Sequence, residues 1–424
     1  MMKQTHVVII GGGFAGLELI EQLKTSDKFR VTLVDMNNYN FFPPLLYQVA
    51  SGFMEPSAIS YPFRKILRKK NNTRFRLGEL KQVLPEEQKV ILSNGELRYD
   101  ILVMATGAES NFFGNANVEK NALPMKTISD ALSLRNMILT RVERATRIED
   151  PEQRKKLLTF VIAGAGPTGV ELSGIFAEMR KHILIKDYPE LERKDLGEIY
   201  LIDGQQAVLS AMSVKSQQYS KAKLEKLGVR VKLNTLVQDF DKETVFLSNG
   251  ETISSRNLIW AAGIYARVFE GFNKEDYGRG RRLKTDAFNK VKNYQNIYAL
   301  GDAALVEGDP GYPEGHPQVA QPAIQQARNL GENLLKAPSK TWTPFKYSDK
   351  GSMAIIGSNK AVADGPEERF FLKGFIAWFA WVFVHIMSLV NFRNRLRALY
   401  DWTGYYTHKD QSFRMIIKPR EMKK

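Results

Sequence analysis

The stretches Gly11-Gly12-Gly13-Phe14-Ala15-Gly16 and Gly164-Ala165-Gly166-Pro167-Thr168-Gly169 decide the fold of this chain. Each is a Gly-x-Gly-x-x-Gly pattern that follows a β-branched run and opens a plausible helix. In such a pattern the first glycine makes the tight turn from strand to helix, and the second lets the backbone approach a pyrophosphate. The third glycine lets the helix pack closely on the strand. The sequence therefore predicts two dinucleotide sites on one chain.

The residues around the two glycine patterns repeat as well. Ser93-Asn94-Gly95-Glu96 recurs as Ser248-Asn249-Gly250-Glu251, and Met104-Ala105-Thr106-Gly107 corresponds to Trp260-Ala261-Ala262-Gly263. The corresponding landmarks are offset by nearly the same number of residues, which indicates one structural unit laid down twice with small insertions. A single glycine pattern is weak evidence for a nucleotide site, whereas a repeated unit around it is strong.

The composition is that of a globular protein and excludes some kinds of site. The 424 residues are 43% apolar and 25% charged, enough for two or three domains. The chain has no cysteine, which excludes disulfides, thiolate metal sites and a redox-active cysteine pair. No His/carboxylate cluster has metal-ligand spacing, so we expect no metal. The formal charge of +15 favours an anionic partner, without choosing between nucleic acid, an acidic protein and an anionic membrane.

The segments around the first glycine pattern predict a parallel strand over 6–10, a helix over 14–24 and a second strand over 30–35. Asp35 ends the second strand. An acidic residue at this place accepts hydrogen bonds from the ribose hydroxyls of an adenosine, so Asp35 completes the fingerprint. The alternative is a solvated aspartate at a strand end.

The second repeat predicts the same order, with a strand over 158–163, a helix over 170–180 and a strand over 198–203. Asp203 ends the last of these and is the expected ribose acid. It lies farther from its glycines than Asp35 does, because a lysine-rich helix extension is expected over 182–194.

A later apolar strand ends in Leu300-Gly301-Asp302, which places a carboxylate at the edge of a sheet where open α/β folds bind ligands. Because this strand follows the second repeat, we expect the second nucleotide domain to be inserted into the first. A helix is expected over 321–335.

The C-terminal part of the sequence does not continue the nucleotide-binding pattern. The aromatic-rich apolar stretch 374–390 is followed by a basic amphipathic segment, and residues 373–424 hold ten Lys or Arg against three acids. Such a combination is typical of a helix that lies on a bilayer. The alternatives are a helix that spans the bilayer, for which the stretch is barely long enough, and a buried core or dimer interface. His385 interrupts the stretch and is interpreted as a hydrogen-bonded or interface residue, not a ligand.

Over nearly its whole length the chain resembles the two-dinucleotide-binding-domain flavoproteins and, among them, the type 2 NADH:quinone oxidoreductases, which are single-subunit and do not pump protons. The glycine patterns alone specify only the larger group. The narrower resemblance is carried by Phe42-Pro43-Pro44-Leu45-Leu46-Tyr47-Gln48-Val49-Ala50, by Ala320-Gln321-Pro322-Ala323-Ile324-Gln325, by Gly351-Ser352-Met353-Ala354-Ile355-Ile356-Gly357 and by the apolar, basic tail.

The resemblance implies that the first repeat binds FAD and the second binds NADH as substrate. The implied FAD residues are Gly11, Gly13, Phe14, Ala15, Gly16, Asp35, Thr106, Gly107, Asp302 and Gln321. The implied NADH residues are Gly164, Gly166, Pro167, Thr168, Gly169, Asp203, Ala262 and Gly263. At the position of Asp203, the end of the second strand of the second repeat, this family more often has Glu. A carboxylate at Asp203 repels a 2′-phosphate, and residues 204–211 contain no Lys or Arg to receive one, so NADH is preferred over NADPH. The alternative is use of both nucleotides, because Asp is shorter than Glu, and Gln205 and Gln206 follow it.

The resemblance also implies three catalytic residues. Glu171 faces the junction of nicotinamide, flavin and quinone in this family, where a carboxylate could orient a substrate or move a proton. The alternative is an acid that favours the helix dipole, since Glu18 occupies the same place in the first repeat. Gln321 and Gln325, one helical turn apart, would offer their amides to a quinone carbonyl. Their alternative is a solvated or capping pair.

The expected fold is therefore α/β, with two Rossmann-like domains, the second inserted in the first, and a C-terminal helical region that anchors the protein to a membrane. The expected domains are an FAD-binding domain over 1–115 and 276–340, an NADH-binding domain over 116–275 and a membrane-associating region over 341–424. The first strand begins near residue 5, which leaves no room for a signal peptide.

The resemblance implies a peripheral respiratory enzyme, expected on the cytoplasmic face of a bacterial inner membrane or an equivalent membrane. Its expected partners are NADH, a membrane quinone, an anionic membrane surface and a second copy in a homodimer. No basic-aromatic module interrupts the repeats, so nucleic acid is not expected. Two alternatives remain from the residues: a soluble NAD(P)H-dependent reductase of a small iron–sulfur protein, and an NAD(H)-sensing flavoprotein that acts as an interaction module.

Overall fold

The computed structural model describes residues 4–336, 340–408 and 413–417. The chain forms two compact units, each made of three segments. Unit 1 comprises Met1–Phe41, Tyr61–Glu109 and Ile264–Asp349, and unit 2 comprises Phe42–Ser60, Ser110–Gly263 and Lys350–Lys424. The chain changes units after residues 41, 60, 109, 263 and 349, whereas the expected domain boundaries were after residues 115, 275 and 340. The segment Phe42–Ser60, expected within the first domain, belongs to unit 2.

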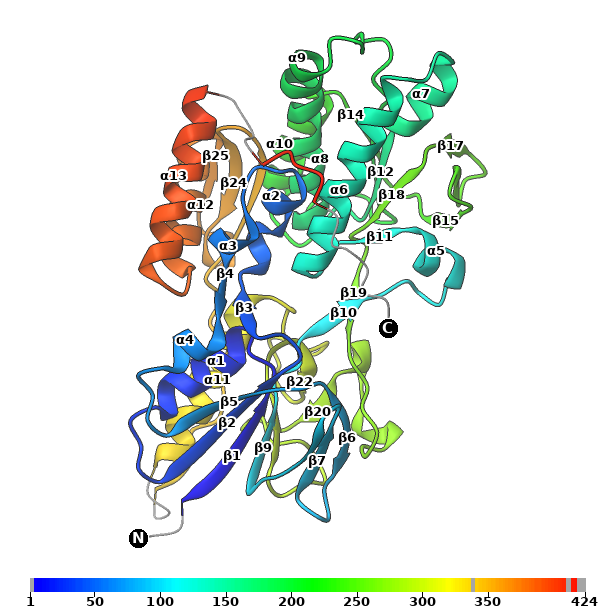
Figure 1. Ribbon diagram of the computed structural model, residues 1–424. Helices are drawn as coiled ribbons and strands as arrows, with labels where there is room; N and C mark the ends of the chain where they lie inside the picture. Colours follow the sequence, from blue (N-terminus) through cyan, green and yellow to red (C-terminus); the bar gives the residue numbers. More distant parts are fainter. Residues whose placement is uncertain (1–3, 337–339, 409–412, 418–424) are drawn as a thin grey trace. The chain divides into compact units, whose positions relative to one another are not determined.

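Unit 1 is built on a parallel sheet with the strand order β21-β9-β1-β2-β5 (Figure 1). Its strands are β1 (Thr5–Ile10), β2 (Phe29–Asp35), β5 (Thr73–Leu77), β9 (Ile101–Met104) and β21 (Ile297–Ala299). β21 follows the second repeat in the chain, yet it pairs with β9. This pairing confirms the prediction that the second repeat is inserted into the first.

Both faces of this sheet are covered, which explains the unbroken apolar runs of its strands. Val7 and Ile9 pack in one core with the helices α1 (Phe14–Leu23) and α11 (Ala320–Leu335). Val8 and Ile10 pack in a second core with an antiparallel three-stranded meander. The meander strands are β6 (Leu80–Leu84), β7 (Lys89–Leu92) and β8 (Gly95–Arg98).

Unit 2 repeats this plan. Its parallel sheet has the order β11-β18-β12-β13-β14. The strands are β11 (Leu123–Pro124), β12 (Phe160–Ala163), β13 (Ile199–Ile202), β14 (Val229–Lys232) and β18 (Asn257–Trp260). A second meander consists of β15 (Val237–Phe240), β16 (Thr244–Leu247) and β17 (Thr252–Ser254).

The repeated Ser-Asn-Gly-Glu sequence is explained by the meanders. Ser93 Oγ accepts a hydrogen bond from the N–H of Glu79 at 3.1 Å, and Ser248 Oγ accepts one from Leu236 at 2.9 Å. Gly95 and Gly250 both have positive φ, at 117° and 83°, which few other residues adopt. The motif is therefore a hairpin turn that was duplicated with the fold.

The main helices of unit 2 are α6 (Ile128–Ala145), α8 (Pro167–Met179) and α10 (Val214–Lys226). The helix extension expected over 182–194 is shorter than predicted. A π-helical stretch, Arg180–Leu184, leads into α9 (Ile185–Asp187), and the helix ends there. Tyr188 precedes a proline, and its φ of −123° and ψ of 78° lie outside the helical region.

The other segments that precede the C-terminal region are short. They are β3 (Tyr39–Phe41), β4 (Ser60–Pro62), β10 (Ala108–Ser110), β19 (Ile264–Ala266), β20 (Leu283–Thr285), β22 (Ala304–Val306), α2 (Leu46–Ala50), α3 (Pro56–Ile59), α4 (Phe63–Leu67), α5 (Ala116–Asn121) and α7 (Pro151–Leu158), together with short 3-10 turns.

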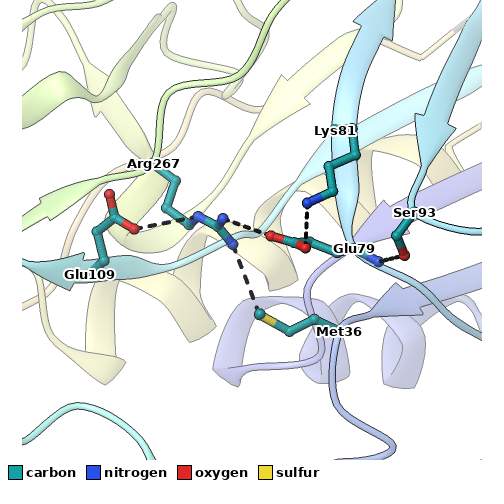
Figure 2. A network of polar contacts seen from close by, with 6 residues as sticks. All are labelled: Met36, Glu79, Lys81, Ser93, Glu109 and Arg267. Atoms are coloured by element: carbon teal, nitrogen blue, oxygen red, sulfur yellow. Dashed lines mark hydrogen bonds and ion pairs between the residues drawn. The ribbon is translucent and has the colours of Figure 1, made fainter. Parts of the chain in front are cut away.

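Arg267 joins three segments of unit 1 through the polar network of Figure 2. Its Nη2 lies 3.0 Å from Glu79 Oε1, and its Nε lies 3.4 Å from Glu109 Oε2. Glu79 is also paired with Lys81, 2.6 Å away. Arg267 directly follows β19. Through this network it is tied to β10, which contains Glu109, and to Glu79 at the start of the first meander.

The C-terminal region, part of unit 2, adds an antiparallel sheet and two helices. They are β23 (Ser352–Gly357), β24 (Lys360–Asp364), β25 (Phe371–Lys373), α12 (Gly374–Ser388) and α13 (Phe392–His408). β23 packs against α8 at Gly174, where a Cβ would lie 2.2 Å from the carbonyl oxygen of Ile356. Among the residues described, no helix has the length and apolar character needed to cross a bilayer.

Candidate dinucleotide sites

The first glycine of each pattern has a backbone that only glycine tolerates. Gly11 has a φ of 105° and Gly164 a φ of 102°. A Cβ on Gly11 would lie 2.2 Å from the carbonyl oxygen of Ala105, and one on Gly164 would lie 2.4 Å from that of Ala261. The turn and the end of the neighbouring strand therefore touch through backbone atoms in both repeats.

The third glycine of each pattern is also required by packing. A Cβ on Gly16 would lie 1.9 Å from the carbonyl oxygen of Gly11, and one on Gly169 would lie 1.8 Å from that of Gly164. Both distances are far below van der Waals contact. These glycines are therefore explained by the fold alone, without any ligand.

The middle glycines have no such explanation. An added Cβ on Gly13 or Gly166 would meet no atom within 4 Å, and both residues have ordinary extended angles. Each is the N-cap of its helix, and neither helix has a side-chain cap or an acidic residue in its first turn. Open space in front of uncapped N–H groups suits a pyrophosphate, which a side chain here would displace. The residues present thus fit a dinucleotide at both turns.

The two acids have a structural task that sequence reasoning missed. Asp35 Oδ2 accepts the N–H of Gly12 at 2.7 Å, and Asp203 Oδ2 accepts that of Ala165 at 2.5 Å. Their second oxygens accept the N–H groups of Asn37 and Gln205. Burial raises the pKa of Asp35 above its usual value. Each acid therefore braces its glycine turn, and its contact with a ribose stays a prediction.

The other residues of the first site lie at the carboxyl ends of adjacent strands. Thr106 and Gly107 follow β9, and Asp302 follows β21. Gly301, with a φ of 65°, forms the turn before Asp302, and Gln326 Oε1 accepts its N–H at 2.7 Å. Gln326, which is buried, was missed by sequence reasoning, since a glutamine in a helix gives no signal that it holds a distant turn.

The first turn of α11 meets this group of residues. A Cβ on Gly301 would lie 3.0 Å from Ala323 Cβ and 3.8 Å from Ala15 Cβ. Small residues therefore bring the fingerprint helix, the Gly-Asp turn and the start of α11 together in unit 1. Phe14 is the first residue of α1, and Gln321 is the second residue of α11.

The two glutamines of α11 differ in their surroundings. Tyr347 donates its hydroxyl hydrogen to Gln321 Oε1 at 3.2 Å. Gln325 is bonded twice to the backbone of Ser348, with Nε2 donating to the carbonyl at 2.8 Å and Oε1 accepting the N–H at 2.9 Å. These two bonds favour the capping alternative for Gln325, and its action on a quinone stays a prediction.

The second site has the same arrangement. Pro167 and Thr168 begin α8, and Ala262 and Gly263 follow β18. The space beside Gly263 is bounded by Phe113, whose ring lies edge-on to Trp260 with centroids 6.4 Å apart. The residues predicted for the second nucleotide are therefore brought to one end of the unit 2 sheet.

Glu171 and Glu18 occupy equivalent positions but differ in environment. Glu18 pairs with Arg328, with Nε 2.7 Å from Oε1. Glu171 is buried, and no ion pair involves it in the part of the chain that the structure describes. The N–H of Ile355, on β23, donates to its carboxylate, and burial raises the pKa of Glu171 to about 8. A carboxyl that changes charge near neutral pH suits proton transfer, a role that a helix-dipole acid does not require.

His385 is held as a hydrogen-bonded residue. Its Nδ1 lies 2.7 Å from the carbonyl oxygen of Trp381, and its ring stacks on Trp381 with centroids 3.7 Å apart. Burial lowers the pKa of His385 to about 4, so the ring is neutral at physiological pH. Across the ranges described, no group of three or more His, Asp or Glu is arranged to hold a metal ion.

Comparison with known families accounts for nearly the whole chain. The pyridine nucleotide-disulphide oxidoreductase model matches residues 5–327, and the NDH2 C-terminal domain model matches residues 350–406. The boundary between the two matches falls close to the start of β23. Because the chain has no cysteine, the disulphide chemistry of the first family's name has no counterpart here.

Individual proteins narrow the assignment. The chain is 36% identical to the type II NADH:quinone oxidoreductase Ndh of Mycobacterium tuberculosis, over 95% of this chain and 88% of that protein. It is 35% identical to NdhA of the same organism, over 94% and 86%. The solved structure of NDH2 from Plasmodium falciparum in complex with NADH has the same fold, with a TM-score of 0.88, 24% identity and coverage of 98% and 100%. The chain therefore belongs to the family of type II NADH:quinone oxidoreductases.

Proposed function

We propose that this protein oxidises NADH and passes the electrons through bound FAD to a membrane quinone, without pumping protons. The observation that carries the proposal is the pair of glycine turns whose middle positions, Gly13 and Gly166, are open where a pyrophosphate would lie. Membership in the family agrees with it. FAD supplies the chemistry, because its ring accepts a hydride and returns two electrons.

The residues of unit 1 bind and orient FAD. The uncapped first turn of α1 holds the pyrophosphate, while Asp35 fixes the turn and offers its remaining hydrogen-bonding capacity to the adenosine ribose. Asp302 binds the ribityl chain. The start of α11, which has no acidic residue in its first turn, directs N–H groups at negative charge on the flavin ring.

Turnover with alternative acceptors tests the function. Detergent-solubilised protein should reduce a short-chain quinone faster than any small iron–sulfur carrier. The reverse order would favour a soluble reductase of an iron–sulfur protein. Slow flavin reoxidation by every quinone would instead favour an NAD(H)-sensing interaction module.

Asp203 determines the preference for NADH over NADPH. In Asp203→Arg the repulsion of a 2′-phosphate is replaced by attraction, so the ratio of kcat/KM for NADH to that for NADPH should fall at least about tenfold, equivalent to about 1.4 kcal/mol. The FAD content should not change. Asp203→Asn is the control, because its amide oxygen can still accept the hydrogen bond from the N–H of Ala165 while the negative charge is removed. An unchanged ratio in Asp203→Arg would contradict this role.

Glu171 donates a proton to the quinone. Removing a general acid lowers rates by about 10²-fold or more, so kcat of Glu171→Gln should fall by that order while FAD stays bound. The raised pKa means that the carboxyl is protonated below pH 8 and charged above it. The kcat of the unaltered enzyme should therefore fall as the pH rises through about 8, and the variant should lack this step.

Glu18→Gln is the matched control, because it changes the same residue type at the same helical position of the other repeat. It should leave kcat and its pH profile unchanged. A Glu171→Gln variant with unaltered kcat and the original pH profile would refute the proton-donor role.

We also propose that α12 and α13 bind an anionic membrane surface. Phe375, Ile376, Phe379 and Phe383 on α12 are each at least 60% exposed, and Phe392 at the start of α13 is 71% exposed. The other side of α12 is occupied, since Trp381 is buried against Tyr47 and Trp402. Arg395 donates to the carbonyls of Met387 and Leu389 at the end of α12. Arg397 lies near Asp401, which leaves the exposed Arg393 to face lipid headgroups. The cytoplasmic face and the homodimer expected from the sequence stay predictions.

Two exposed phenylalanines test this surface. The double variant Phe379→Ser/Phe383→Ser should bind anionic vesicles at least about tenfold more weakly, because each buried Phe contributes about 1.5–3 kcal/mol. Dye reduction by NADH should persist. Val214→Ser, at an equally exposed position on α10, controls for general loss of apolar surface. Undiminished vesicle sedimentation of the double variant would contradict the proposal.

A further inference from the structure

A groove of about 810 Å³ opens on unit 2 at a place that the nucleotide sites do not use. It is lined by one face of α6 from Ser133 to Arg144, by Leu157 at the end of α7, by Lys242 and Glu243 between β15 and β16, and by Arg256 before β18. Leu157 lies three residues before the start of β12, and Arg256 directly precedes β18. The glycine turn lies at the carboxyl ends of the same parallel strands, so the groove is at the opposite edge of the sheet.

Positive charge in this groove exceeds negative charge. Arg141, Arg144, Lys242 and Arg256 line it, and Glu243 is its only acid among the described residues. The carboxylate of Glu243 is already shared between Lys156 and Arg256. No ion pair within the described ranges involves Arg141, Arg144 or Lys242. At least three cations therefore face the groove without a neutralising partner.

Two of the four cations, Arg141 and Arg256, are held in place by the protein, whereas Arg144 and Lys242 are exposed. Arg141 Nη1 donates to Asn257 Oδ1, and Asn257 is fully buried with its Nδ2 bonded to the carbonyls of Leu157 and Thr159. The Nε of Arg256 is buried and has no hydrogen-bond partner. Burial, together with the nearby charges of Arg256 and Arg144, lowers the pKa of Arg141 to about 10.

Such an arrangement is unfavourable within the protein alone. Like charges that are partly desolvated repel each other, and a buried N–H without an acceptor loses the hydrogen bond that water gave it. An anion with several oxygens would neutralise these charges. Its oxygens would accept hydrogen bonds from the guanidinium groups, whose N–H geometry fits a phosphate. Met137 and Leu157 add apolar surface beside the cations.

We propose that this groove binds a soluble anion that carries two or more phosphate groups, such as a pyrophosphate or a nucleotide polyphosphate. A lipid headgroup has the same chemistry, but α7 and β15 lie on one side of unit 2 and the helices α12 and α13 lie on the other (Figure 1). The groove is lined from α6, α7 and the β15–β16 turn, and not from α12 or α13, so we choose the soluble source; this choice rests on the assignment of α12 and α13 to the membrane.

The test measures pyrophosphate binding by calorimetry. The FAD-loaded protein is kept in saturating NAD⁺, which occupies the second glycine turn. The double variant Arg141→Gln/Arg144→Gln should bind pyrophosphate at least about tenfold more weakly, since hydrogen bonds to charged groups are among the strong ones. Lys120→Gln/Lys215→Gln removes the same charge from exposed positions of unit 2 and should change the affinity less than about twofold.

Three outcomes would overturn the proposal. The first is no binding by the unaltered protein at millimolar pyrophosphate, and the second is equal affinity in the groove variant. The third is a groove variant that loses binding to phosphatidylglycerol vesicles while the Lys120→Gln/Lys215→Gln control keeps it, which would assign the groove to a lipid headgroup. Both double variants should keep the flavin absorbance and NADH oxidation with a soluble dye, so a failed proposal for the groove is distinguishable from a failed assignment of function.

Discussion

Gly13→Val should give a folded protein that retains no FAD. The backbone angles of Gly13, φ −74° and ψ −157°, are open to any residue, and its Cβ would contact no protein atom. The side chain would occupy the space in front of the first turn of α1, where the pyrophosphate binds. The purified variant should therefore lack flavin absorbance, while its melting temperature should equal that of the unaltered protein stripped of FAD.

Gly16→Ala is the contrasting variant. Its Cβ would lie 1.9 Å from the carbonyl oxygen of Gly11, so the strand-to-helix turn has to break before any cofactor is involved. We expect this protein to be insoluble or to melt well below the stripped protein. A Gly13→Val protein that is as yellow as the unaltered one would show that the pyrophosphate does not bind at this turn.

Gly166→Val should impair the use of NADH without affecting the binding of FAD. Gly166 has φ −69° and ψ −175° and the same open surroundings as Gly13, so the substitution should leave the fold intact. FAD should remain bound because its residues lie in unit 1. Reduction of the flavin by NADH should slow by at least about 100-fold, or about 2.7 kcal/mol, because the nucleotide phosphates lose the first turn of α8.

Photochemical reduction controls for damage to the flavin in Gly166→Val. Light and a sacrificial donor should bleach the flavin of this variant as fast as that of the unaltered protein, and a quinone should restore the colour. Equal rates of NADH reduction in the two proteins would contradict the assignment of the second turn to NADH.

The duplicated fold could be predicted from the sequence because glycine patterns and hairpin turns report backbone geometry directly. Gly11 and Gly164 must be glycine because of their positive φ and the close backbone of the neighbouring strand, so both repeats have glycine at this position. The insertion of the second repeat followed from the position of Gly301-Asp302 in the chain, and the pairing of β21 with β9 confirms it.

Contacts between distant segments could not be predicted in this way. The segment 351–357 was part of the family resemblance, but no structural role for it could be read from the sequence. In the structure it forms β23, which packs against α8. There the N–H of Ile355 reaches Glu171, and Gly174 allows the close approach. Glu171 and Glu18 hold equivalent positions in the two repeats, and only the family resemblance singled out Glu171; the difference in their environments could not be read from the repeats. The difference arises because Arg328 lies beside one and β23 beside the other.

The braces of the glycine turns were missed for a similar reason. Asp35 and Asp203 were recognised as ribose acids, yet each also accepts the N–H of a residue inside its turn. The resemblance assigned Gln325, together with Gln321, to a quinone; its amide bonds the backbone of Ser348, a contact that the sequence did not reveal, and its action on a quinone stays a prediction. A spacing of one helical turn places two side chains on one face but does not say what that face meets.

An anaerobic titration follows electron transfer from NADH through the bound flavin to a quinone. NADH is added stepwise to the purified yellow protein, and a short-chain quinone follows. We expect one equivalent of NADH to bleach the flavin and one equivalent of quinone to restore it fully. A folded protein that takes up no FAD, or a bleached flavin that no quinone reoxidises, would contradict the account.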